Sequence, residues 1–165
     1  MRPTRPPTRP PTESSLPRFE RAEKFLTEFG IADPAALANP NSPQAKATNW
    51  IVYDDAFNID IPDPMQGNNG RQYSDTRFTE RWALAVFYYS TGGESWLYKF
   101  NFLQPIDHCG WYDRFIDGTG RVIRQGVTEC QKFEPNFDID KVSRIEISRS
   151  CVFCFGLYIL CKLVT

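Results

Sequence analysis

Residues 81–93 read RWALAVFYYSTGG and give the strongest helix signal in the chain. Together with Phe78 upstream, its apolar side chains recur with the period of an amphipathic helix. Residues 82–89 are apolar or aromatic on every side, so we expect this helix to be central and buried. We expect Asp75 to cap its start and Gly92 and Gly93 to end it.

Three shorter helical segments are expected upstream. Apolar residues at helical spacing over residues 15–29 predict an amphipathic helix that ends at Gly30. Asp33-Pro34 predicts a one-turn helix. Ser42-Pro43 predicts another helix, because serine is a preferred N-cap and proline fits the first helical position; it should run to about Asp54.

The sequence after residue 93 changes character and becomes irregular and aromatic. Gly118-Thr119-Gly120 is typical of a hairpin tip, so we expect short strands around it. Residues 56–74 contain proline, glycine and asparagine and should form a loop. The expected fold class is therefore α+β.

Composition and charge exclude several classes of function. The 165 residues include 19 basic and 20 acidic side chains, so no strong field draws the chain to nucleic acid. The first 30 residues lack the apolar run of a signal peptide, and residues 2–12 are expected to form a proline-rich arm. The longest apolar run, residues 151–161, is far shorter than the roughly 20 residues of a spanning helix.

Three motifs follow the central helix in a fixed order. Trp96 is followed by Phe102-Leu103, then by Cys109-Gly110-Trp111, then by Gly126-Val127 shortly before Cys130. With residues 42–50 and 81–93, this order resembles the N-terminal cap of plant-type and algal leucine-rich-repeat proteins. The resemblance covers about residues 40–150.

The resemblance implies a mainly helical cap with short strands and the first strand of a leucine-rich-repeat solenoid. It implies a Cys109–Cys130 disulfide; two unpaired core cysteines are the alternative. Val142, Ile145 and Ile147 match the first three apolar positions of the repeat. The cap core implied by the resemblance consists of Trp50, Trp82, Val86, Tyr89, Trp96 and Trp111.

Composition, periodicity and the resemblance together divide the chain into five parts. Residues 1–15 form the arm, 16–40 an amphipathic helix and linker, 41–140 the cap, and 141–152 a partial first repeat. Residues 153–165 are interpreted as an aberrant apolar tail, because the repeat pattern stops abruptly there and an array needs at least three repeats.

Other candidate sites carry weaker patterns. Cys151, Cys154 and Cys161, with His108, lack the polar knuckle of a zinc site. His108 next to Cys109 lacks a third group to orient a thiol nucleophile. The acidic run over residues 54–63 lacks the calcium-loop pattern, so we interpret it as a solvated loop. We expect no metal, cofactor or catalytic residue.

The sequence therefore predicts a non-enzymatic scaffold fragment. By family resemblance, the full-length protein would bind protein, peptide or glycan ligands through its repeats, in an extracellular or membrane-associated setting. The alternative is a small thiol-dependent enzyme or redox protein that uses Cys109 and Cys130, in which case Cys130 should be reactive rather than bridged.

Overall fold

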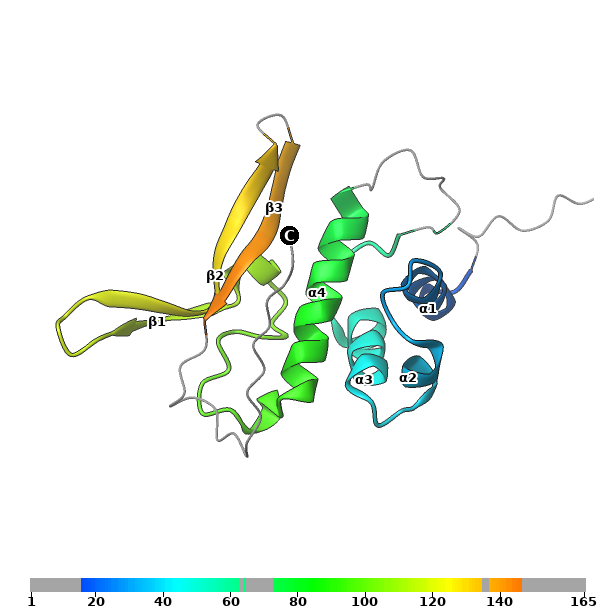
Figure 1. Ribbon diagram of the computed structural model, residues 1–165, viewed down its shortest axis with the longest axis horizontal. Coiled ribbons are helices and arrows are strands. Elements are labelled where there is room, and N and C mark those ends of the chain that lie inside the picture. Colours follow the sequence, from blue (N-terminus) through cyan, green and yellow to red (C-terminus); the bar gives the residue numbers. More distant parts are fainter. Residues whose placement is uncertain (1–15, 63, 65–72, 135–136, 147–165) are drawn as a thin grey trace, which may run out of the picture.

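The computed structural model describes residues 16–62, 64, 73–134 and 137–146 (Figure 1). The predictions for residues 1–15, for Ile147 and for the tail from Cys151 onward lie outside these ranges. The described part contains helices and a three-stranded antiparallel sheet in the order β1-β2-β3, which confirms the α+β class.

The helices occupy the first half of the chain. They are α1 (Arg18–Glu28), α2 (Pro34–Ala38), α3 (Pro43–Asn49), which continues into a π-helical turn (Trp50–Asp54), and the long α4 (Tyr73–Ser90). Two 3-10 turns follow, η3 (Gly93–Ser95) and η4 (His108–Gly110). The strands are β1 (Tyr112–Ile116), β2 (Val122–Glu134) and β3 (Phe137–Glu146).

α4 lies at the centre of the molecule, with α1, α2 and α3 on one side and the sheet on the other (Figure 1). It contacts α3 and, across the opposite face, β3. This is the central position that the apolar residues 82–89 predict. One hydrophobic core therefore extends from the N-terminal helices through α4 to the sheet.

The helix starts follow their sequence signals in two of three cases. A side-chain oxygen of Asp33 accepts a hydrogen bond from the Ala35 amide at 3.0 Å, and Ser42 Oγ accepts one from the Ala45 amide at 2.9 Å. α4 instead begins at Tyr73, so Asp75 lies in its first turn and is not the N-cap. An acidic residue is favourable at either place, because both lie at the positive end of the helix dipole.

Two adjacent glycines end α4 for different reasons. Gly92 takes a left-handed conformation with φ 68°, which glycine adopts at little cost. Gly93 is buried against Tyr88, and a β-carbon there would lie 2.1 Å from a ring carbon of that tyrosine. The first glycine turns the chain and the second allows it to pass close to the helix.

The N-terminal helix belongs to the same core as the segment that we assigned to the cap. Phe25 and Leu26 are buried, and the Phe25 ring meets Phe78 of α4 edge-on at 5.6 Å between centroids. Leu37 of α2 joins the same cluster. α1 and α2 therefore contribute side chains to the same hydrophobic core as α4.

A tight turn closes the β1–β2 hairpin at the predicted tip. A carboxylate oxygen of Asp117 accepts hydrogen bonds from the Thr119 and Arg121 amides, each at 2.9 Å. The same oxygen accepts from the Thr119 hydroxyl, and these bonds lower the pKa of Asp117, the hydroxyl bond having the largest effect. The turn sets Ile116 opposite Val122.

β2 and β3 pair with three register shifts. Val142 lies opposite Cys130 and Arg144 opposite Glu129, so Ser143 is an extra residue on β3. Because side chains alternate along a regular strand, residues three apart face opposite sides. The extra residue at Ser143 returns Val142 and Ile145 to the same face of the sheet, and both side chains pack against the core.

Candidate functional site

The turn η4 and strand β2 are joined by a disulfide between Cys109 and Cys130, with 5.9 Å between the Cα atoms. This is the pairing that the family resemblance implies. Both cysteines are only partly buried, and Cys130 packs against the core. Because the two sulfurs are bonded to each other, neither is the free thiol that the alternative of a thiol-dependent enzyme requires.

The two cysteine-containing motifs also meet through the backbone. The Val127 amide donates a hydrogen bond to the Trp111 carbonyl at 2.8 Å, and Tyr112 lies opposite Gly126 in the β1–β2 ladder. Trp111 and Val127 are both fully buried. The Cys-x-Trp and Gly-Val elements are therefore held together by the disulfide, by the backbone hydrogen bond and by packing of the buried Trp111 ring.

The six residues of the expected cap core divide into two groups. Trp50, Trp82, Trp96 and Trp111 are buried, whereas Val86 and Tyr89 are partly buried and pack against the core. Trp50 and Trp111 meet edge-on at 5.9 Å between ring centroids. These six residues lie in a single cluster that connects α3, α4 and the segment before β1.

A buried ion pair that sequence reasoning missed lies beside these tryptophans. Nε and Nη2 of Arg81 each lie 2.6 Å from a carboxylate oxygen of Asp55, and both side chains are fully shielded from solvent. The interpretation of residues 54–63 as a solvated loop is therefore wrong for Asp55. Its partner is 26 residues away on α4, and no local pattern reveals such a pair.

Arg81 also holds the loop that precedes η4. Its Nη1 donates to the Ile106 carbonyl at 2.8 Å and its Nη2 to the Gln104 carbonyl at 3.1 Å. The guanidinium carbon lies 4.6 Å from the centre of the Trp111 ring and 4.7 Å from that of Phe57. Carboxylate, carbonyls and ring faces together replace the water that the buried cation has lost.

One residue before Arg81 on α4, Glu80 connects η4 to β3. A carboxylate oxygen of Glu80 lies 3.3 Å from His108 Nε2 and accepts from the Val142 amide, also at 3.3 Å. His108 is fully buried, which its position beside a half-exposed cysteine does not indicate. Glu80 thus fixes the imidazole ring and occupies one amide on the edge of β3 that faces away from β2.

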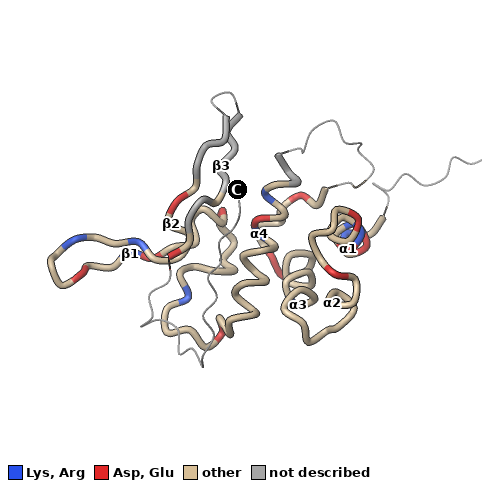
Figure 2. The backbone as a smooth tube through the Cα atoms, in the orientation of Figure 1, with Lys and Arg blue, Asp and Glu red and all other residues tan. Residues whose placement is uncertain are grey.

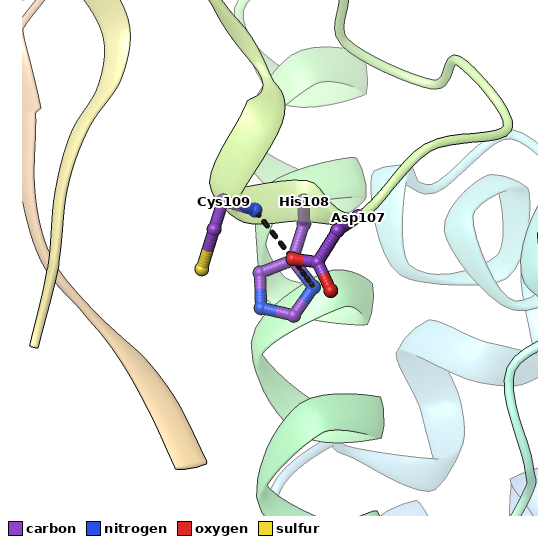
Figure 3. A group of neighbouring side chains, drawn as sticks. All are labelled: Asp107, His108 and Cys109. Atoms are coloured by element: carbon purple, nitrogen blue, oxygen red, sulfur yellow. Dashed lines mark hydrogen bonds and ion pairs between the residues drawn. The ribbon is translucent and has the colours of Figure 1, made fainter. Parts of the chain in front are cut away.

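Asp107, His108 and Cys109 form a small group of potential ligands at the start of η4 (Figure 3). A carboxylate oxygen of Asp107 accepts from the Cys109 amide at 2.9 Å, and the other carboxylate oxygen pairs with Arg77. One donor atom from each of the three residues lies within 4.8 Å of the others. Sequence reasoning considered His108 as a zinc ligand with the C-terminal cysteines and as a base for Cys109, but it did not group either residue with Asp107.

Charged residues of both signs are spread along the described chain. α1, α4 and the β1–β2 hairpin each contain basic and acidic residues (Figure 2). Over the described ranges, no helix is both long enough and apolar enough to cross a membrane.

Comparison of the chain with protein-family models, with curated proteins and with solved structures found no match.

Proposed function

We propose that this chain is the N-terminal cap of a leucine-rich-repeat protein and acts as a non-enzymatic scaffold. The observation that carries the proposal is the direct bonding of the two cysteine motifs. The Cys109–Cys130 bridge and the hydrogen bond from Val127 to Trp111 tie η4 and the residue that follows it to β2, the strand that pairs with β3, and β3 carries the repeat pattern.

A cap must cover the apolar end of a repeat array and present a strand to it. β3 is suited to this role because it is the last strand in the sheet order, and Val142 and Ile145 already pack against the core. At Val142 the outer edge of β3 is occupied by Glu80. We therefore infer that the strand of the next repeat would pair with β3 only beyond Val142.

The resemblance to leucine-rich-repeat proteins also suggests which partners the full-length protein would bind. The repeats would bind protein, peptide or glycan ligands, and the cap would keep the array soluble. By the same resemblance, we propose that the protein is extracellular or attached to a membrane. The bridge supports an oxidising compartment, because disulfides persist where thiols are not kept reduced.

A fusion protein tests the capping role. The chain up to Val152 is joined to an array of plant-type consensus repeats that lacks its own N-terminal cap. We expect the array to unfold at a higher temperature in the fusion than alone, because the cap shields its terminal apolar face.

The matched control is the fusion with Cys109→Ser and Cys130→Ser. It should lose part of the gain, since a bridge that closes a loop of about 20 residues contributes on the order of 3 kcal/mol. An array that unfolds at the same temperature with and without the cap would rule out the proposal.

A further inference from the structure

One nitrogen of the buried His108 ring lacks a hydrogen-bond partner within the described residues. Glu80 faces Nε2, and an ionised carboxylate only accepts, so Nε2 is the donor, and in the neutral ring Nδ1 then carries a free lone pair. Nδ1 is buried and makes no hydrogen bond. Leaving a buried acceptor unsatisfied is unfavourable, so this atom is suited to a ligand.

The groups around Nδ1 are metal ligands. A carboxylate oxygen of Asp107 lies 3.9 Å from it, and the Cys109 sulfur completes a group within 4.8 Å. Cys130 is at the same place, because its sulfur is bonded to that of Cys109. Ligand atoms about 2.0–2.3 Å from a tetrahedral zinc ion lie roughly 3.3–3.8 Å from one another. Side-chain movements of about 1 Å would therefore bring these donor atoms to the spacing that zinc requires.

We propose that reduction of the Cys109–Cys130 bridge creates a tetrahedral site for a zinc-type cation, with Asp107, His108, Cys109 and Cys130 as ligands. Glu80 is the positioning residue: a carboxylate on the far nitrogen of a ligating histidine fixes the orientation of the ring. The metal would replace the disulfide as the crosslink between η4 and β2, so the fold would be held in both redox states.

The chemistry balances with a tertiary phosphine as reductant. The phosphine takes up an oxygen atom from water and becomes a phosphine oxide, while the two protons of that water and the released electron pair give two cysteine thiols. Binding of the cation then releases both thiol protons. Zn²⁺ with two thiolates and one carboxylate leaves a net charge of -1, which the Arg77 guanidinium beside Asp107 balances.

The test uses the full chain with Cys151→Ser, Cys154→Ser and Cys161→Ser, so that only the two bridge cysteines remain. Co²⁺ is added to the oxidised and to the phosphine-reduced protein. We expect the reduced protein to bind one equivalent, seen as sulfur-to-cobalt charge transfer with tetrahedral visible bands. Zn²⁺ should displace it, because soft thiolate sites hold zinc tightly.

Variants separate this site from adventitious binding. Asp107→Asn and His108→Gln should each weaken Co²⁺ binding, and Glu80→Gln should weaken it by about 10–100-fold, the usual effect of losing such a partner. Glu20→Gln, on the exposed face of α1, should bind normally. Near-ultraviolet circular dichroism of the tryptophans reports folding in every sample.

Three results would overturn the proposal. The first is equal Co²⁺ binding by the oxidised protein. The second is unchanged binding in His108→Gln or in Asp107→Asn, whichever of the two is folded. The third is a reduced protein that unfolds and is not refolded by Co²⁺. Unfolding on reduction that Co²⁺ reverses with the expected bands would support it.

Discussion

Gly126 approaches the carbonyl oxygen of Trp111 so closely that a β-carbon on Gly126 would lie 2.4 Å from that oxygen. The same position has φ 109°, which side chains rarely adopt. Contact between the Cys-x-Trp motif and the Gly-Val motif therefore depends on a residue without a side chain. Close backbone approach and a positive φ thus explain why glycine stands at position 126 of the Gly-Val motif, and the sequence alone does not show this.

Substitution of this glycine should be costly. Gly126→Ala should lower the free energy of unfolding by roughly 2–5 kcal/mol, from backbone strain of about 1–2 kcal/mol and overpacking of about 1–3 kcal/mol. Gly120→Ala is the matched control, because its φ is 84° and no atom lies within 4 Å of the added carbon. Urea unfolding of both variants measures the difference; equal losses would show that close approach contributes nothing.

The buried ion pair should behave as one unit. Arg81→Leu or Asp55→Leu alone should cost about 3–5 kcal/mol, because each leaves an uncompensated buried charge. The double substitution should cost clearly less than the sum of the two, since it removes both charges together. Urea unfolding at neutral pH gives the three values, and simple additivity would mean that the two charges do not interact.

Trp82 contributes both volume and a hydrogen bond. Trp82→Ala should cost about 3–5 kcal/mol as a large core truncation. Trp82 Nε1 donates to the Thr48 hydroxyl at 2.9 Å. Thr48→Val removes that acceptor, together with the hydroxyl's own hydrogen bond to the Gln44 carbonyl, and should cost about 1–3 kcal/mol. An unchanged melting temperature in Trp82→Ala would place α4 at the surface.

Alkaline pH should destabilise the protein through Tyr89. Burial, and secondarily the charge of Glu94, raise the pKa of Tyr89 to about 12, against about 10 when unfolded. The folded state thus favours the neutral phenol, and this contribution is complete below pH 10 and is lost as pH rises towards 12. Unfolding free energies across this window should fall less steeply in Tyr89→Phe than in the exposed control Tyr53→Phe; equal slopes would contradict it.

Local signals predicted much of the fold. Ser42-Pro43 fixed the start of α3, and the helical spacing around Leu26 placed α1, because capping and periodicity depend only on neighbouring residues. Asp55 and Glu80 could not be found in this way. Their partners lie 26 and 28 residues away in sequence, and their importance comes from burial that only the assembled core creates.

The capping role requires that β3 pair with the first strand of the repeat array. Hydrogen exchange of the cap–array fusion measures whether backbone amides of β3 beyond Val142 and of the first array strand become protected when the two are joined. We predict slower exchange in both segments than in the separate parts, with the Val142 amide unchanged because Glu80 already binds it. Unaltered exchange rates in both segments would contradict the proposal that this chain seats a leucine-rich-repeat array.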